Sequence, residues 1–212
     1  MSLLRQTIEA DIWGGRRTHA WLIKFLALLF LRRGQRSCIA WLRLAQFFKR
    51  RGHIRLARWC VATIERRFGC YFHINAEVGP GINLPHPIGI VVGEGVKIGA
   101  GCKLYQHVTL GGRRLGDWRA GNYPQLGDHV VVFCGAAILG SVRVGDGATI
   151  GANAVVLDSV PSCQVAVGVP ARVVERPGPL AEARITRCTL APSEPRYDAA
   201  ARDTTDTGLG SH

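Results

Sequence analysis

The chain has 212 residues, 47% of them hydrophobic, and a formal net charge of +12. This length is enough for one domain with a real core and an appendage, and the hydrophobic content excludes an intrinsically disordered protein. Seven scattered cysteines show no C-x-x-C spacing, so we expect neither a disulfide framework nor a zinc site, and we predict a reducing, cytoplasmic environment.

Residues 1–70 are predicted to be a basic α-helical segment. The apolar run over residues 20–31 contains Lys24 and has twelve residues, whereas a bilayer-spanning helix needs about 20. This run is interpreted either as a buried helix or subunit contact, or as a helix at a membrane surface. Two more helices are predicted at helical spacing over residues 38–52 and 54–68, each ended by a glycine.

The positive charge is concentrated in the same segment. Residues 1–70 contain fifteen Lys and Arg residues against three acids, which accounts for the whole net charge. Such a surface suits anionic lipid or phosphate-rich ligands. No nucleic-acid-binding motif is present, so no nucleic-acid partner is predicted. We expect either a solvated basic face or a peripheral membrane contact through residues 20–67.

Residues 71–177 contain a repeat with a period of six. Aliphatic residues recur at this spacing, and a small or β-branched residue follows four positions after each: Leu126, Val132, Ile138, Val144, Ile150 and Val156. An earlier run shares the period: Phe72, Val78 and Leu84, then Val92, Ile98, Leu104 and Leu110. This period fits neither a helix nor a long strand. It predicts stacked triangular coils of short parallel strands, about 4.8 Å apart, with glycines after the lead aliphatic residues relieving backbone strain at the corners.

The stretch LPHPIG, residues 84–89, interrupts this repeat. It places His86 between Pro85 and Pro87, and both prolines restrict the backbone around the ring. From the residues alone, His86 is either part of a simple bend or a catalytic base.

A second interruption covers residues 111–125 and is predicted to be a loop that projects from the coils. Its arginines could meet phosphates or an anionic acceptor, or could simply be solvated: Arg113, Arg114 and Arg119. Gly111 and Gly112 at its start would let a ligand approach the backbone closely. Residues 178–212 are polar and aperiodic, and they are predicted to form a flexible tail.

Three stretches resemble serine acetyltransferases and the related sugar- and polysaccharide-modifying O-acetyltransferases: GIVVGEGVKIGAGCKLYQHVTLGG (89–112), AAILGSVRVGDGATIGANAVVLDSVP (136–161) and VAVGVPARVV (165–174). The resemblance covers about residues 35–175. It implies a mainly β fold, a left-handed parallel β-helix of hexapeptide repeats preceded by α-helices. The left hand comes from the resemblance, since parallel crossovers are normally right-handed. It also implies a homotrimer, or a dimer of trimers, with active sites between subunits.

The resemblance further implies acetyl transfer from acetyl-CoA to an acceptor hydroxyl by direct attack, without a metal. His86 matches the family's general base, and an imidazole, with an ordinary pKa of about 6.5, suits this step. On the cofactor side the resemblance marks Gly111 and Gly112, and also Ala136 and Ala152, whose small side chains leave room for the pantetheine arm. The loop arginines would cross a groove between subunits. The acceptor is L-serine or a saccharide hydroxyl.

Three departures from the family weaken L-serine as the acceptor. Pro85 stands where the family has a carboxylate beside the base, and Tyr123 stands where it has a second histidine. The family's serine-binding Asp-Pro pair has no counterpart between Asp11 and Phe48. His107 is counted one coil beyond His86, so it is either a surface histidine or a second active-site histidine that helps to position the acceptor.

The same departures leave a different class of function open. A β-helix that has lost acceptor-side residues could be a non-catalytic scaffold that binds a partner enzyme or a membrane surface. Turnover of acetyl-CoA with any acceptor separates the two hypotheses.

Overall fold

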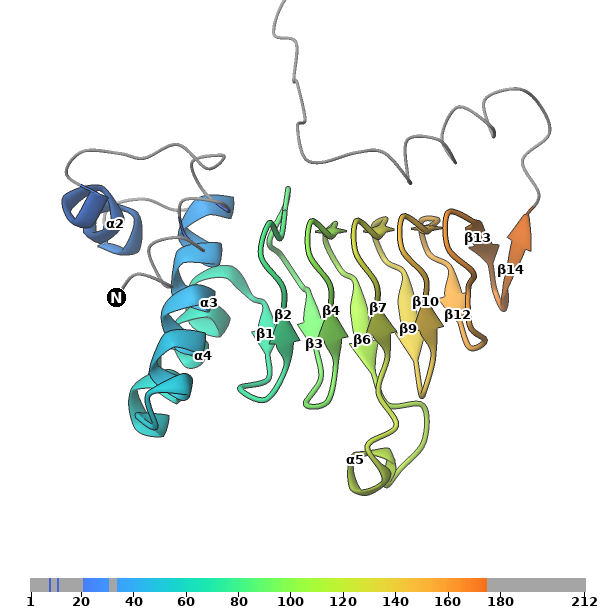
Figure 1. Ribbon diagram of the computed structural model, residues 1–212, viewed down its shortest axis with the longest axis horizontal. Coiled ribbons are helices and arrows are strands. Elements are labelled where there is room, and N and C mark those ends of the chain that lie inside the picture. Colours follow the sequence, from blue (N-terminus) through green and yellow to red (C-terminus); the bar gives the residue numbers. More distant parts are fainter. Residues whose placement is uncertain (1–7, 9–10, 12–20, 31–33, 175–212) are drawn as a thin grey trace, which may run out of the picture.

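The computed structural model describes residues 8, 11, 21–30 and 34–174. The predicted flexible tail over residues 178–212 lies outside this part. Three helices form one end of the molecule and a stack of triangular coils forms the rest (Figure 1): α2 (Trp21–Phe30), α3 (Gln35–Arg50) and α4 (Ile54–Phe68). None of the helices described is long and apolar enough to cross a membrane.

Helices α3 and α4 form a packed pair. Their apolar faces bury Ile39, Trp41, Cys60 and Ile64, none of which is more than 2% exposed. Helix α4 has the predicted bounds and ends at Gly69, whose φ of 62° is a left-handed conformation that glycine adopts without a Cβ penalty. The predicted helix over residues 38–52 is confirmed, although α3 begins and ends earlier.

Helix α2 packs on α3. Phe25, Leu28 and Leu29 are buried, and the Leu29 carbonyl accepts a hydrogen bond of 3.2 Å from the Trp41 indole N–H. Burial of these three side chains favours the interpretation of the apolar run as a helix packed within the protein, although Leu26 on α2 is exposed. The alternative of a helix at a membrane surface stays a prediction.

The coils form a prism with three parallel sheets. The first sheet has the order β1 (Tyr71–Phe72), β3 (Val91–Val92), β6 (Thr109–Gly111), β9 (Ala137–Leu139) and β12 (Val155–Val156). The second has β2 (Glu77–Val78), β4 (Lys97–Ile98), β7 (Gln125–Leu126) and β10 (Arg143–Val144). The third has β5 (Lys103–Leu104), β8 (Val131–Val132), β11 (Thr149–Ile150), β13 (Val165–Gly168) and an antiparallel last strand, β14 (Ala171–Val174).

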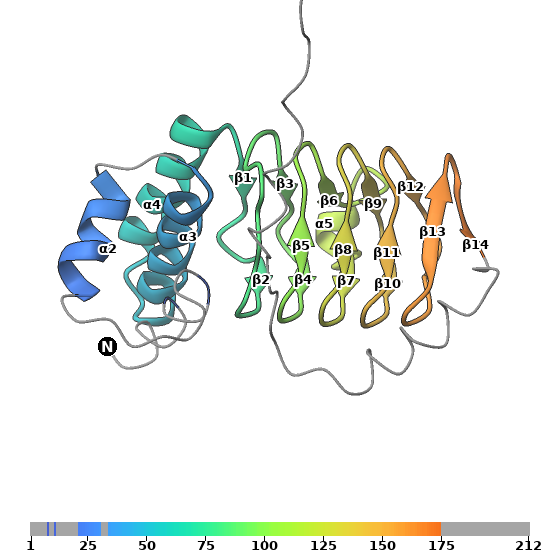
Figure 2. The same cartoon turned by 90° about the horizontal axis from the view of Figure 1, so that it is seen from above.

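The hexapeptide register is the one the repeat predicts. Val92, Leu110 and Ile138 are partners in successive coils, and all three are fully buried. The small residues four positions on, such as Ala148, are also buried and fill the narrow interior. The fold is a left-handed parallel β-helix, mainly β, as predicted. The α3–α4 pair covers one end of the prism, and the β13–β14 hairpin lies at the other (Figure 2).

The glycines after the lead aliphatic residues have a different role from the predicted one. A Cβ on Gly79 would lie 2.7 Å from the Gly99 carbonyl carbon in the next coil, so close approach of coils requires glycine there. The left-handed corners lie instead three residues before the lead residues of the first and third sheets, and the second sheet has none at this position. Gly89 and His107 are examples, with φ of 65° and 59°. The backbone strain therefore falls at a different place in the repeat.

A buried polar network joins the helices to the first coil. The Arg43 guanidinium forms an ion pair with Asp11, and both side chains are at most 2% exposed. Arg43 also donates to the carbonyls of Val78, at 2.7 Å, and Gly79, and Asp11 accepts from the Gly81 N–H. Burial of the two charged side chains is tolerated because they are paired with each other and hydrogen-bonded. The network therefore holds the helices against the first coil of the prism.

Candidate functional site

His86 lies in a bulge at one edge of the prism, between the third and first sheets. The first-sheet partners Phe72 and Val92 are 20 residues apart, whereas Val92 and Leu110 are 18 apart, so this coil carries two extra residues. The His86 side chain is exposed, whereas Pro87 is buried. The Ile88 N–H donates to the His86 carbonyl at 2.8 Å. The buried proline and this tight turn hold the bulge, and the imidazole faces outward.

The ring next to His86 is that of Tyr105. The two ring centroids are 6.5 Å apart, and Tyr105 in turn stacks on Phe133 at 5.1 Å with an interplanar angle of 11°. Both aromatic residues follow directly after a third-sheet strand, one coil apart. Sequence reasoning missed them, although counting one coil from the bulge leads to Tyr105. Beside it, Gln106 Oε1 is a buried acceptor without a donor among the described residues.

This site lies at the helical end of the prism. Three residues before His86, Asn83 Oδ1 accepts a hydrogen bond of 2.7 Å from Gln35 Nε2 on α3. Three residues after it, the Gly89 N–H donates to the Gly69 carbonyl at the end of α4, at 3.0 Å. The helix pair therefore supports the bulge from both sides.

His107 occupies an exposed corner one coil beyond Gly89. Its ring fills the space that Gly89 leaves, because a Cβ there would overlap the imidazole. The same pairing recurs at another edge, where His129, with φ of 56°, lies over Gly101. This recurrence favours a structural corner role for His107, and its acceptor-positioning role stays a prediction.

The loop over residues 111–125 projects as predicted and contains the short helix α5 (Asp117–Ala120). The Asp117 carboxylate accepts the backbone N–H groups of Arg113 at 2.6 Å and Arg114 at 2.7 Å, and it also accepts the Asn122 side-chain amide at 3.2 Å. The Arg114 N–H, together with the Asn122 amide, holds the pKa of Asp117 below its usual range. Asp117 is thus the internal anchor of the loop.

Within one chain, the structure does not bring this loop to His86. The loop connects β6 in the first sheet to β7 in the second, whereas the His86 bulge connects the third sheet to the first. Helix α5 accordingly projects from the opposite side of the prism to the bulge between β2 and β3 (Figure 1). The side chains of Arg113, Arg114 and Arg119 are exposed at that distant edge.

Tyr123 lies at the same distant edge, beneath the loop. Its half-buried ring packs over Gly93, where an added Cβ would lie 3.1 Å from Cε1, and over Gly95, where a Cβ would overlap the ring. Burial raises the pKa of the phenol, and the carboxylates of Glu94 and Asp117 add to the effect. Tyr123 is therefore not a neighbour of His86 in the same chain.

The four residues predicted on the cofactor side are in different environments. Ala152 is exposed, and a Cβ on Gly111 would meet nothing within 4 Å. A Cβ on Gly112 would lie 3.0 Å from Cβ of Asp117, so its own loop accounts for this glycine. Ala136 is fully buried in the prism interior, and its place on the cofactor side stays a prediction. In the described residues no three His, Cys, Asp or Glu side chains are grouped to hold a metal.

Chemically, the site offers an exposed imidazole on a rigid bulge, held next to an aromatic stack. An imidazole in this setting can take a proton from a hydroxyl group. The arginines of the loop over residues 111–125 lie at a different edge of the prism.

Comparison with known proteins supports a specific family. The family model for the bacterial transferase hexapeptide (six repeats) matches residues 123–158. A serine acetyltransferase of Staphylococcus aureus (strain Mu50) is 39% identical over 124 residues, which cover 58% of this chain and 57% of the relative. One from Synechococcus elongatus is 40% identical over 133 residues, covering 58% and 54%. The chain thus spans less than two thirds of the length of these curated relatives.

Solved structures extend the similarity into the helical part. A serine acetyltransferase in complex with CoA is 33% identical with a TM-score of 0.66, covering 82% of this chain and 70% of that one. Soybean serine acetyltransferase complexed with serine is 34% identical with a TM-score of 0.69 and the same coverage. The hexapeptide prism, the preceding helix pair and these similarities together show that the chain belongs to the serine acetyltransferase family of hexapeptide-repeat acyltransferases.

Proposed function

We propose that this protein transfers the acetyl group of acetyl-CoA to an acceptor hydroxyl, with His86 as the general base. The observation that carries the proposal is the exposed His86 imidazole on its proline-flanked bulge, in a chain similar to serine acetyltransferases. The imidazole takes the hydroxyl proton as the acceptor oxygen attacks the thioester carbonyl. The carbon–sulfur bond then breaks, and the imidazolium returns the proton to the CoA sulfur.

L-serine is the acceptor that the relatives' names support, and a saccharide hydroxyl is the alternative. Soybean serine acetyltransferase has been solved with serine, which supports serine for this chain by similarity. The departures at Pro85 and Tyr123 favour an altered acceptor site, because Pro85 supplies no carboxylate and Tyr123 supplies a phenol in place of an imidazole. The acceptor assay below is designed to separate the two.

A homotrimer with shared sites is part of the proposal. The loop arginines and His86 lie at different edges of one prism, so they can serve the same acetyl-CoA molecule only if neighbouring chains contribute them. In this arrangement Arg113, Arg114 and Arg119 of one chain bind CoA phosphates near His86 of the next. Pairing of trimers, a cytoplasmic location and a membrane contact across residues 20–67 stay predictions.

Thiol release from acetyl-CoA tests the activity, first with L-serine and then with a panel of free and nucleotide-linked sugars. His86→Ala should lower turnover by roughly 10² to 10⁴, the usual contribution of positioned proton transfer. Its fold and acetyl-CoA affinity should remain, because the exposed ring fills no core. His129→Asn is the matched control, since an asparagine tolerates the left-handed φ of that exposed corner.

Two results would count against this proposal. If the His86→Ala protein keeps full turnover on its true acceptor, His86 is not the general base. Folded wild-type protein that releases no thiol with any acceptor would favour the non-catalytic scaffold.

A further inference from the structure

The helical end of the molecule has a strongly one-sided charge. Between residues 34 and 70 there are nine Lys and Arg residues and a single acid, Glu65. Arg43 is buried with Asp11, but six arginines in this range are exposed: Arg36, Arg50, Arg51, Arg55, Arg58 and Arg66. A protein that needed this surface only for solubility would have no reason to exclude acids from it. The surface is therefore suited to an anionic partner.

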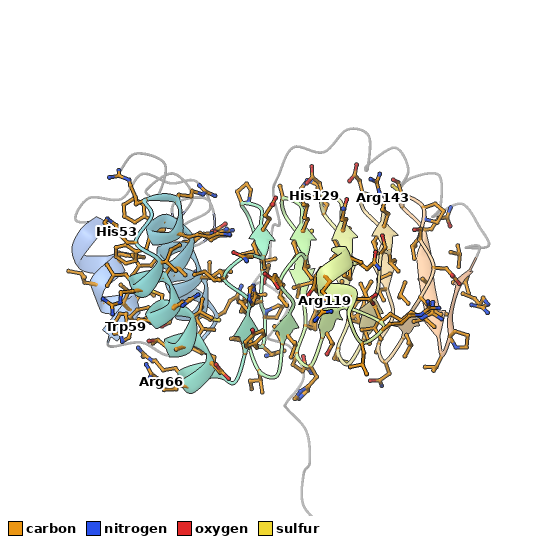
Figure 3. The ribbon with its side chains drawn as sticks, turned by 90° about the horizontal axis from the view of Figure 1, so that it is seen from below. His53, Trp59, Arg66, Arg119, His129 and Arg143 are labelled. Carbon is orange, nitrogen blue, oxygen red and sulfur yellow. The ribbon has the colours of Figure 1, made fainter. Side chains whose placement is uncertain are left out.

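Apolar side chains are exposed among these arginines on α4. Trp59 is 50% exposed, Leu56 46% and Ile54 40%. Arg55 lies four residues before Trp59 and Arg66 seven after it, so the helical period places all three on one face. Figure 3 shows Trp59 and Arg66 following one another along the outer side of α4. We call Ile54, Arg55, Leu56, Arg58, Trp59 and Arg66 the α4 face.

We propose that the α4 face docks on an anionic lipid bilayer. Arginines near a negatively charged bilayer surface are attracted to its headgroups, and a half-exposed tryptophan is the side chain that favours the membrane–water interface. The Trp59 ring contacts the Trp41 ring on α3 with the centroids 5.3 Å apart and an interplanar angle of 73°. This contact holds Trp59 in place while half of its surface stays exposed. An anionic bilayer therefore matches both the charge of the arginines and the exposed apolar surface of Trp59.

The other possible occupants fit less well. A second copy docked by the same patch about a two-fold axis would bring like charges face to face, which is unfavourable. A nucleic acid would match the arginines, but it would leave the aliphatic Ile54 and Leu56 without an apolar partner. A bilayer satisfies both classes of side chain.

This docking would place the candidate site near the lipid surface. Asn83 and Gly89, which flank the His86 bulge, are both hydrogen-bonded to the helix pair that carries the α4 face. The inference does not depend on the proposed acetyl transfer, because lipid binding is measured without turnover.

Vesicle co-sedimentation of the full chain tests the proposal. We expect binding to phosphatidylcholine vesicles that contain phosphatidylglycerol, and little binding to pure phosphatidylcholine. The Arg55→Glu/Arg66→Glu variant should bind the anionic vesicles at least about 30-fold more weakly, since each basic residue near the surface contributes roughly fivefold. Arg143→Glu/Arg172→Glu is the matched control: it makes the same charge change at exposed arginines on the prism and should bind like the wild type.

A second pair of variants tests the apolar anchor. Trp59→Ala should lower binding to the anionic vesicles, whereas Trp59→Phe should retain most of it, with circular dichroism confirming the fold of each. If both double-arginine variants lose the same amount of binding to anionic vesicles, the binding depends only on net charge, and the proposal is overturned. So would equal binding to neutral vesicles, tighter binding to a duplex oligonucleotide through the same arginines, or self-association that Arg55→Glu/Arg66→Glu abolishes without any vesicle binding.

Discussion

At the residue scale, the support of His86 differs from what the family pattern implies. Pro85 occupies the position of the adjacent carboxylate, and the neighbour that the structure supplies is the Tyr105 ring, itself stacked on Phe133. An aromatic neighbour can fix the orientation of an imidazole by packing, but it supplies no negative charge. We therefore infer that Tyr105 is a positioning residue for His86.

Tyr105→Ala should lower kcat by roughly tenfold to a hundredfold, because a base displaced by about an ångström loses its alignment with the hydroxyl. KM for acetyl-CoA should change little. Tyr105→Phe should retain kcat, since the proposed support comes from the ring and not from the phenol hydroxyl. Steady-state kinetics of both variants provide the test. If Tyr105→Phe lowers kcat as much as Tyr105→Ala does, the phenol hydroxyl is the important group, and the explanation by ring packing is wrong.

At the scale of elements, two local devices hold irregular parts to the prism. Asp117 organises the loop over residues 111–125 through backbone N–H groups, and Arg43 with Asp11 ties the helices to the first coil. Neither device belongs to the hexapeptide repeat. Each can therefore be removed while the repeat itself remains.

Asp117→Ala should increase amide hydrogen exchange at Arg113 and Arg114 by roughly threefold to tenfold, as expected when a capping carboxylate is lost. Asp117→Asn, which keeps an acceptor oxygen, should have a smaller effect. Because the pKa of Asp117 is lowered in the folded loop, the charged form stabilises it above the ordinary carboxyl range, and this contribution disappears as the pH falls through the lowered pKa. If amide hydrogen exchange at Arg113 and Arg114 is the same in Asp117→Ala and in the wild type, Asp117 does not anchor the loop.

Arg43→Met should lower the free energy of unfolding by about 3–5 kcal/mol, because Asp11 is left as an unpaired buried charge. The double variant Arg43→Met/Asp11→Leu should recover part of this loss, since no charge then remains buried. Urea denaturation of both variants measures the difference. A double variant less stable than Arg43→Met would show that the ion pair is not the source of the penalty.

At the scale of the whole molecule, the separation of the loop from His86 matters most for function. One prism presents His86 at one edge and the loop arginines at another, so under the proposed function a complete site would need two chains. If the sites are shared in this way, we expect activity to require oligomerisation, and we expect a stable trimer in analytical ultracentrifugation.

Mixed trimers give a direct test of shared sites. His86→Ala lacks the base, and the variant with alanine at the three loop arginines should bind acetyl-CoA weakly, with a raised KM. When the two are co-expressed and assayed at limiting acetyl-CoA, activity should exceed that of either alone, because some interfaces combine an intact base with an intact loop. A mixture no more active than its components would place the whole site within one chain.

Much of the fold and part of the site could be predicted from the sequence. The period of six determines which residues face inward, because a chain that turns every six residues brings every lead position to the interior. The predicted aliphatic ladder is accordingly buried, for example Leu104, Val132 and Ile150. The bounds of α4 also follow from the sequence, since Gly69 supplies the left-handed C-cap. The two interruptions were recognised because they break the period.

Contacts that do not follow the six-residue period were decided only by the tertiary structure. Coil counting placed His107 on the face of His86, but the contact is made by Tyr105, because two extra residues in the bulge shift His86 relative to the corner. Ala136 is buried because its repeat position is an interior one. The sequence by itself determined the prism, its helical end and the exposed His86, through periodicity and local backbone chemistry. The edge of the prism on which each side chain lies was decided only by the three-dimensional closure of the coils. Closure brings together residues far apart in sequence, such as His86 and Tyr105, and places His86 and Arg113 at different edges.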